Sequence, residues 1–504
     1  MPSYLAAILL FTSFSLPSVL WASEETPPSL PLSVAQIQAK QGDREAQYQL
    51  GKRLILGQDI TKSHSDAASW LQKAALQGHA EAAYLLGTMY QTGEGVEQDA
   101  TQAVRWLRLA AEQNIAAAQF ELAGHYKEGL GVAPEQTMAH HWLMQAAQQG
   151  LDVAQLALGA RYSRGIGVEA DKKEAMKWVH KAAMQNLTEA ESLLGMYYRE
   201  GIGTDINHRA ATYWFERAAA KGNAYAQVNL GQQYTLGLGV EKNSAIATKW
   251  FRKAAEQGLA EAQYNMGLNY LQGRGMPQDD AVGADWVAKA ASQGLAAAQL
   301  LQGRLYALGR GVPQDLKQAE FWLYKAAEQD LPDAQLALAR WYVAQEPQNL
   351  AAAFHWYKKA APANTTAQLE MAELYPENSW VPTREQLAEW LLEHAGKGDG
   401  QAQLYLATLY AQGNDVKQDK TQARYWLNKA IAQQVVGSVF ISQMLLAEDK
   451  QQSAKLIQLQ SAGKRQQQDA LYALSWLYRF GIGTNVDTRL AASWYQQWMA
   501  TQGL

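Results

Sequence analysis

The sequence predicts an all-α fold, built as a repeat array of about thirteen antiparallel helix pairs. Three observations indicate this: tryptophans return every 36 residues, a Gly-x-Gly loop returns eight times, and apolar residues between them follow the helical period. The 36-residue interval is held by Trp70, Trp106, Trp142, Trp178, Trp214, Trp250, Trp286 and Trp322. A chain of 504 residues can therefore be one repeat array without an internal domain boundary.

Each unit divides into two amphipathic halves. The first half has a short apolar stripe, with small residues placed between side chains such as Met266 and Tyr270. The second half has apolar residues at i, i+3, i+4, i+7 and i+8, for example Ala247, Trp250, Phe251, Ala254 and Ala255. Small residues let two helix backbones approach closely while Trp and Tyr fill the volume beside them. Each unit is therefore predicted to be an antiparallel helix pair.

The loop between the two halves reads YKEGLGV at residues 126–132, and close variants occupy the other units. Glycine-rich loops can hold phosphates, but a phosphate loop follows a strand and carries a Lys-Ser/Thr pair or a third glycine at set spacing. This loop joins two helices and has neither. We expect the first glycine to be a left-handed helix C-cap and the second to permit the chain reversal.

The segments AQYNMGLNYLQGRG and AIATKWFRKAAEQG closely resemble the two halves of the Sel-one-like repeat, a relative of the tetratricopeptide repeat. The resemblance covers residues from about 37 to 498. It implies a right-handed α-solenoid that acts as a scaffold or adaptor, and it does not imply an enzyme. Each unit of a solenoid contacts mainly its neighbours, and the array offers a long concave face for binding.

Residues 1–22 are predicted to be a cleaved secretory signal peptide, because they are apolar and end in small residues before the first acidic pair. A retained N-terminal anchor is the alternative. Residues 23–36 are a short linker and 37–504 are the solenoid, regular over 37–340 and degenerate over 341–504. The chain has no cysteine, which excludes disulfides, thiolate metal sites and a lipidated cysteine. We expect a periplasmic or secreted protein of a Gram-negative bacterium.

The charge pattern disfavours two classes of partner. The formal net charge is −4, and lysine and arginine are spread evenly along the chain. The sequence therefore predicts no basic patch that could bind nucleic acid or an anionic membrane surface. No apolar run outside the predicted signal approaches the length of a membrane span, so no membrane insertion is expected after cleavage. The expected partner is a protein or an extended peptide.

The degenerate third of the chain contains the tryptophans that do not follow the repeat: Trp341, Trp380, Trp476 and Trp498. Trp380 stands between two prolines, where burial is difficult, and exposed aromatic residues are preferred anchors at protein interfaces. We predict a partner-binding patch that includes Trp341, Tyr375 and Trp380. The alternative is altered core packing where the repeat decays.

A second predicted binding row lies on the first helices of consecutive units. Asn229 and Gln233 are spaced i, i+4, and Asn265 and Asn269 repeat the pair one unit later. Arg161 and Tyr197 occupy the position of Gln233 in earlier units. In related repeats the first helix lines the groove, where amide side chains can hydrogen-bond a peptide backbone. The alternative is that these are solvated polar residues.

The residues that catalysis or metal binding would need are missing from the sequence. There is no His-Glu-x-x-His, no nucleophile elbow, and no pair of carboxylates placed for acid-base work. The adjacent His140 and His141 point about 100° apart on a helix, so with His125 they offer only a loose zinc site. We expect no enzyme activity, no cofactor and no metal.

These observations favour a non-enzymatic interaction scaffold of the bacterial envelope or exterior. Two alternatives stay open: a secreted factor that binds a host glycoprotein such as an immune protein, and a carbohydrate-binding module that stacks sugars on Trp341 and Trp380.

Overall fold

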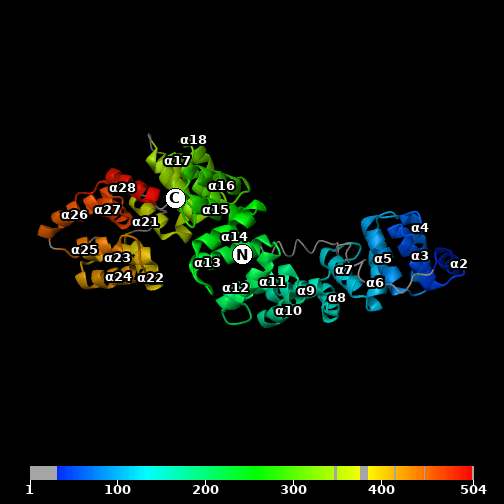
Figure 1. Ribbon diagram of the computed structural model, residues 1–504. Coiled ribbons are helices and arrows are strands. Elements are labelled where there is room, and N and C mark those ends of the chain that lie inside the picture. The colour runs from blue at the N-terminus through cyan, green and yellow to red at the C-terminus, as the bar shows by residue number, and fades with distance from the viewer. Residues whose placement is uncertain (1–30, 346–348, 375–383, 414–415, 448, 502–504) are drawn as a thin grey trace. The chain divides into compact units, whose positions relative to one another are not determined.

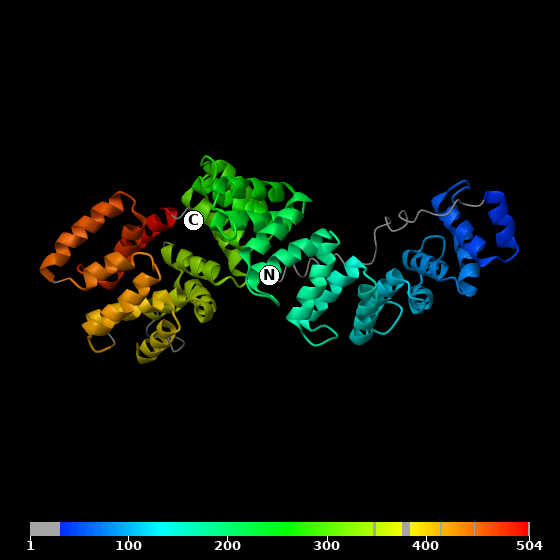
Figure 2. The ribbon, with the colours of Figure 1, turned by 60° about the horizontal axis from the view of Figure 1, so that its bottom comes forward.

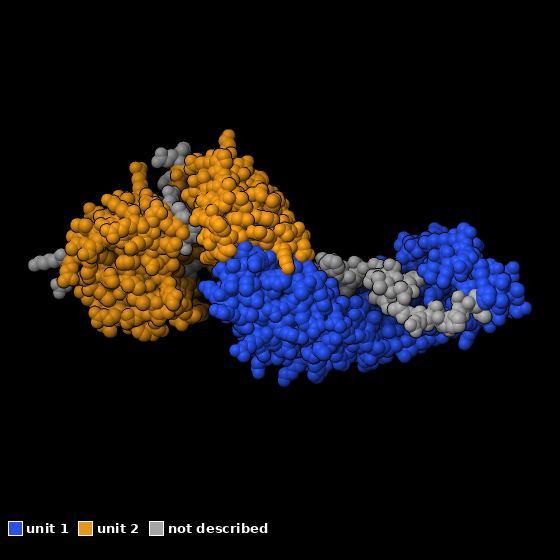
Figure 3. All heavy atoms as spheres, in the orientation of Figure 1, with its two compact units in different colours: residues 1–250 blue, residues 251–504 orange. Residues whose placement is uncertain are grey.

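The structure is a computed structural model that describes residues 31–345, 349–374, 384–413, 416–447 and 449–501. These residues form α-helices and one short 3-10 helix, with no strand among them. They divide into two compact units, residues 1–250 and 251–504 (Figure 3). The predicted all-α fold is confirmed. The first described helix starts at Leu32, within the segment 23–36 that was predicted to be a linker.

Unit 1 contains a single first helix followed by helix pairs, and its last helix, α14, continues into unit 2 (Figure 1). The helices are α2 (Leu32–Lys40), α3 (Arg44–Leu56), α4 (His64–Leu76), α5 (Ala80–Thr92), α6 (Ala100–Glu112), α7 (Ala116–Glu128), α8 (Gln136–Gln148), α9 (Asp152–Arg164), α10 (Lys172–Met184), α11 (Thr188–Glu200), α12 (His208–Ala220), α13 (Ala224–Leu236) and α14 (Ser244–Glu256).

Unit 2 continues the pairing and becomes irregular after α19 (Figure 2). Its elements are α15 (Ala260–Gln272), α16 (Asp280–Ser292), α17 (Ala296–Leu308), α18 (Leu316–Ala327), α19 (Pro332–Ala344), α20 (Leu350–Ala360), η2 (Ala361–Ala363), α21 (Thr365–Leu374), α22 (Arg384–Gly396), α23 (Gly400–Gln412), α24 (Lys420–Ala432), α25 (Ser438–Leu445), α26 (Asp449–Lys464), α27 (Gln468–Phe480) and α28 (Thr488–Thr501).

Local sequence signals set the helix ends. Second helices of a pair commonly begin after an aspartate: the Asp99 carboxylate accepts hydrogen bonds from the backbone N–H groups of Thr101 and Gln102 at the start of α6. First helices commonly end at a left-handed glycine, for example Gly129 after α7, with φ of 75°. The predicted C-cap role of the first loop glycine is confirmed.

The second loop glycine has a role beyond chain reversal. Gly131 has φ of +70°, and a Cβ added there would lie 2.2 Å from the carbonyl oxygen of Ala100, the first residue of α6. A Cβ added at Gly167 would likewise lie 2.3 Å from the carbonyl oxygen of Gln136, the first residue of α8. The loop of one pair thus lies directly on the start of the second helix of the preceding pair. Only glycine leaves room for this contact.

A buried glutamine joins three consecutive helices. Gln155 of α9 donates from Nε2 to the carbonyl of Ala147 at the end of α8, at 3.2 Å. Its Oε1 accepts a hydrogen bond from Nε2 of Gln185, just after α10, at 2.9 Å. The same two bonds are made by Gln47, Gln119, Gln263, Gln299 and Gln403. Each of these six repeats therefore satisfies a buried helix-end carbonyl with a side chain of the next helix.

One unit replaces this amide pair with charges. Glu191 of α11 occupies the glutamine position and is fully buried. Its carboxylate accepts from Nε of Arg217 at 2.9 Å and lies 2.9 Å from Nζ of Lys221, which stands where other units have the second glutamine. The link to the residue after α12 is kept as an ion pair, but a carboxylate cannot donate to a carbonyl at the end of α10 as the glutamine does.

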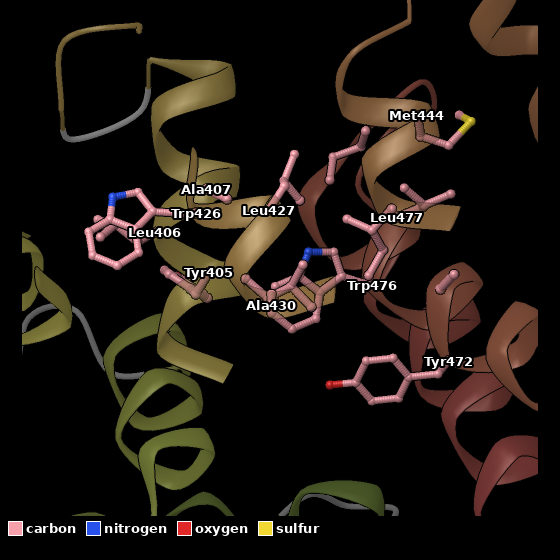
Figure 4. Packing of buried hydrophobic residues seen from close by; sticks show 14 of the residues in the cluster. Tyr405, Leu406, Ala407, Trp426, Leu427, Ala430, Met444, Tyr472, Trp476 and Leu477 are labelled. Carbon is pink, nitrogen blue, oxygen red and sulfur yellow. The ribbon is translucent and has the colours of Figure 1, made fainter. Parts of the chain in front are cut away.

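The end of unit 2 does not follow the expectation that a repeat contacts mainly its neighbours. Trp476 of α27 is buried, packs on Tyr405 of α23 and donates from Nε1 to Oγ1 of Thr408 at 3.2 Å (Figure 4). The Tyr472 hydroxyl donates to Oε1 of Gln401 at 3.1 Å. That expectation is wrong here, because the irregular pair α25 and α26 lets α27 pack against α23, two pairs earlier.

Gly131→Ala tests the contact between loop and preceding pair. Both Gly131→Ala and the control Gly150→Ala place a side chain at positive φ, which costs about 1–2 kcal/mol. A Cβ at Gly150 meets nothing within 4 Å, so only Gly131→Ala adds a steric cost, of about 1–3 kcal/mol. Hydrogen exchange of α6 and α7 amides measures the difference. Equal protection in the two variants would show that the contact is unimportant.

Gln155→Leu tests the three-helix tie. It removes two hydrogen bonds, one to the Ala147 carbonyl and one from the Gln185 amide, and each contributes about 0.5–1.5 kcal/mol, so we expect a loss of about 1–3 kcal/mol in urea unfolding. The Ala147 carbonyl keeps its bond from the Gly150 N–H, and the Gln185 amide keeps its bond to the Gly150 carbonyl. Gln148→Leu, at an exposed position in the same region, should change stability by less than about 0.5 kcal/mol. A loss of the same size in both variants would contradict a role for the tie.

Candidate functional site

A groove of about 1600 Å³ lies on unit 2. Helices α15, α17, α18 and α19 contribute one set of lining residues, and α23, α27 and α28 contribute another. The two sets are far apart in sequence and meet because the last helices pack back on the earlier ones.

The groove has aromatic walls. Trp341 of α19 and Tyr264 of α15 line it, as do Tyr472, Tyr495 and Trp498 from the last helix pair. The Trp498 ring lies 4.9 Å from that of Tyr472 and 5.2 Å from that of Tyr495, measured between centroids. Aromatic surface of this kind favours binding of apolar and planar groups.

A buried carboxylate holds the two sides of the groove together. Glu370 of α21 accepts hydrogen bonds from Nε and Nη2 of Arg340 of α19, at 3.0 and 2.5 Å. It also accepts from Nη1 of Arg479 of α27 at 3.1 Å and from the Tyr357 hydroxyl at 2.7 Å. Arg340 donates from Nη1 to the hydroxyl of Tyr495 on α28. Charge-assisted bonds of this type are strong and directional.

These contacts change the acidity of Glu370. Burial alone would raise the pKa of its carboxyl, but the charges of Arg340 and Arg479 and the hydrogen bonds outweigh burial and lower the pKa to about 2. Because the folded pKa is below the ordinary value, the carboxylate stabilises the fold at neutral pH. That contribution is lost as the pH falls from about 4.5 through about 2.

Arg304 of α17 lines the same groove without such a partner. It stands 36 residues before Arg340, at the same position of the preceding first helix. No hydrogen bond or ion pair joins its guanidinium to any of the residues that the structure describes. Burial lowers its pKa, and the charge of Arg340 lowers it further.

The predicted aromatic patch is placed only in part. Trp341 is partly buried and lines the groove. Tyr375 and Trp380 lie outside the described residues, so their place in the patch stays a prediction. Of the other tryptophans outside the repeat, Trp498 lines the groove and Trp476 belongs to the core.

The predicted amide row is largely inside the repeats. Arg161 is buried and donates to the carbonyls of Ile166 and Gln136 at 3.0 and 2.8 Å, so it supports its own loop. Tyr197, Gln233 and Asn269 are buried as well.

Asn229 and Asn265 are the partly exposed members of the row. Asn229 accepts from Nη1 of Arg199 at 2.5 Å and donates to the carbonyl of Tyr225 at 2.9 Å. The members of the row on α9, α11 and α13 belong to unit 1, and Asn265 and Asn269 on α15 belong to unit 2. Peptide contact by this row stays a prediction.

Sequence reasoning missed Arg304, Glu370 and Tyr495. One signal was present: the position of Arg304 and Arg340 in the first helix holds Thr88, Ala160, Met196 or Leu268 in other units. Two arginines in consecutive units depart from that pattern. Glu370 and Tyr495 gave no signal, because their contacts with Arg340 depend on the irregular packing of the last helices.

The histidines give no metal centre within the described ranges. No group of three or more His, Cys, Asp or Glu side chains there is arranged to hold a metal ion. His125 is buried, and its Nδ1 lies 2.8 Å from the carbonyl oxygen of Leu130. Among the described helices, none combines the length and the apolar character needed to span a bilayer.

Glu370→Gln tests the role of the buried carboxylate. At neutral pH the variant should lose about 3–5 kcal/mol in urea unfolding of the full chain, because two arginines lose their counter-charge. The difference in unfolding free energy between the variant and wild type should shrink as the pH falls from about 4.5 towards 2. Glu393→Gln, at an exposed carboxylate, should leave the stability close to that of wild type at any pH. A gap that is constant with pH would contradict the assignment.

Comparison with known proteins supports the repeat assignment. The family model described as Sel1 repeat matches residues 44–79, 80–115, 116–151, 152–187, 188–223, 224–259, 260–295, 296–331, 332–362, 400–435 and 468–498. The unmatched stretches between these repeats, 363–399 and 436–467, contain the irregular helices α21, α22, α25 and α26. A search of curated proteins found no match.

Two solved structures are similar over much of the chain. One is c5321, described as a protective antigen present in uropathogenic Escherichia coli strains and displaying an SLR fold. It is 30% identical with a TM-score of 0.67, over 94% of this chain and 98% of that one. The other is a Sel1 repeat protein from Oxalobacter formigenes, 31% identical with a TM-score of 0.50, over 67% of this chain and 99% of that one. Such repeat proteins are generally protein-interaction scaffolds and typically non-catalytic. The chain belongs to the Sel1 repeat family.

Proposed function

We propose that the protein is a non-enzymatic scaffold of the bacterial envelope or exterior, and that the groove of unit 2 holds an extended segment of a partner protein. The main observation in support is the size of the groove. Its volume of about 1600 Å³ exceeds the roughly 300–1,000 Å³ of small-molecule sites, so a chain segment fits it better than a metabolite.

The chemistry of the lining supports a peptide. Aromatic walls suit apolar side chains, and Gln345 and Gln401 present amide groups that can pair with backbone N–H and C=O groups. Gln345 forms no hydrogen bond with a described residue, and Nε2 of Gln401 is uncommitted. Tyr375 and Trp380 are proposed to extend the aromatic surface. The row from Arg161 to Asn269 is proposed as a secondary contact through Asn229 and Asn265.

The location is part of the proposal. The apolar segment 1–22 supports export, and the absence of cysteine disfavours a lipid anchor. One observation favours the alternative that the partner is a host glycoprotein: the similar E. coli protein is described as a protective antigen.

Affinity capture with the chain from Ser23 onward tests the proposal, using the cell's own envelope extract and a host secretory-fluid panel in parallel. We expect Trp341→Ala to reduce capture of the same partner about tenfold or more, since a central aromatic anchor commonly contributes over 1.4 kcal/mol. Trp380→Ala tests the predicted extension of the patch.

Phe321→Ala is the matched control, because Phe321 is an exposed aromatic side chain of α18 that does not line the groove. It should leave capture unchanged. Equal capture by Trp341→Ala, Phe321→Ala and wild type, with all three folded by circular dichroism, would exclude the groove as the binding surface.

A further inference from the structure

Arg304 is a groove-lining cation, and none of the carboxylates that the structure describes lies within ion-pair distance of it. Its electrostatic neighbours are Tyr264 of α15, Asp333 and Arg340 of α19, and Tyr495 of α28. The carboxylate of Asp333 lies beyond 4.0 Å from the guanidinium and accepts a hydrogen bond from Nδ2 of Asn364 at 3.0 Å. A partly buried guanidinium keeps its charge, so the arrangement is unfavourable without an anion.

Arg340 shows what the neighbouring unit does with the same residue. The two arginines occupy equivalent positions, 36 residues apart, and both line the groove. Arg340 binds the Glu370 carboxylate through two nitrogens, while no carboxylate of the described residues occupies the corresponding place beside Arg304. The groove thus contains one filled and one unfilled position for a carboxylate.

The remaining charged residues of the groove lining balance one another. Lys317 is an exposed cation in the lining and forms no ion pair with a described residue. The carboxylates of the lining are Glu320, which accepts from the Tyr342 hydroxyl at 2.9 Å, and Asp333. Arg304, Lys317 and these two carboxylates carry no net charge together, because a hydrogen bond from a neutral group leaves a carboxylate charged. The preference for an acidic ligand therefore depends on the empty position beside Arg304.

We infer that the groove selects a partner segment that carries an aspartate or glutamate, whose carboxylate accepts hydrogen bonds from Arg304 between Tyr264 and Tyr495. This inference rests on the proposed function and adds the chemistry of the partner. Arginine matches a carboxylate through two parallel N–H donors, which gives specificity for the acid over the isosteric amide. The aromatic side chains of the groove and the amides of Gln345 and Gln401 then contact the residues on either side of this carboxylate in the partner segment.

The test compares two pools of octapeptides that differ in one residue. Both pools are acetylated and amidated at their ends; one carries a single glutamate at a central position, and the other carries glutamine there. Binding to the full chain is followed by fluorescence anisotropy. We expect the glutamate pool to bind about tenfold more tightly than the glutamine pool. Arg304→Gln should abolish this preference, and Arg304→Lys should retain part of it.

Arg424→Gln is the matched control, since Arg424 is exposed on α24 and does not line the groove. It should keep the full preference. Arg304 makes no ion pair or hydrogen bond with a described residue and its charge is partly buried, so Arg304→Gln should unfold at a temperature no lower than that of wild type.

The outcomes separate this inference from the proposed function. Equal binding of both pools by wild type, or an unchanged preference in Arg304→Gln, would overturn the carboxylate inference while peptide binding itself stands. No binding of either pool up to about 1 mM would overturn both. A third arm with sialyllactose addresses the other common carboxylate: binding of this sugar through Arg304 without peptide binding would identify a glycan site and contradict the inference.

Discussion

The buried glutamine of the first helix is the interaction on which the regular repeats depend. It reaches back to the last turn of the preceding helix and is held from the other side by a glutamine after the following helix. One side chain therefore fixes the relative positions of three helices, and a helix end that is buried between repeats keeps its carbonyl satisfied. The loop glycine adds a second constraint, since it lets each loop lie on the preceding pair.

These two constraints explain how the repeat tolerates variation elsewhere. The exchange of two glutamines for Glu191 and Lys221 preserves one bond of the tie, because an ion pair can span the same distance. After α19 the pattern weakens, and α25 is only eight residues long. The last pair then packs against α19, α21 and α23 through Glu370, Gln401 and Thr408. The groove of unit 2 is the consequence of this irregularity.

The regular part of the fold was predictable because its signals are local. Helical periodicity, aspartate N-caps and glycine C-caps each act within a few residues, and the 36-residue interval of Trp70 to Trp322 repeats them. The candidate site was not predictable in the same way. Arg340 and Tyr495 are 155 residues apart in the chain. Their contact depends on how the last helices pack, and the 36-residue repeat pattern does not predict that packing.

The two predicted binding surfaces, the aromatic patch and the amide row, differ in how well the sequence located them. Trp341 was found because it breaks the repeat, and it does line the groove. Gln233 and Asn269 were chosen because they recur on one helix face, but recurrence also marks residues that pack between repeats, and both are buried. Periodicity alone cannot tell a binding row from a structural one.

The central claim is that the end of unit 2 packs back on its earlier helices through Glu370, and a double-mutant cycle measures it most directly. Glu370→Gln and Arg479→Gln, alone and together, separate the pairwise coupling from the cost of each change. The contact predicts a coupling energy of about 1–3 kcal/mol between residues that are 109 positions apart in the chain. A coupling within about 0.5 kcal/mol of zero would mean that α27 does not lie against α21, and the groove would lose its second wall.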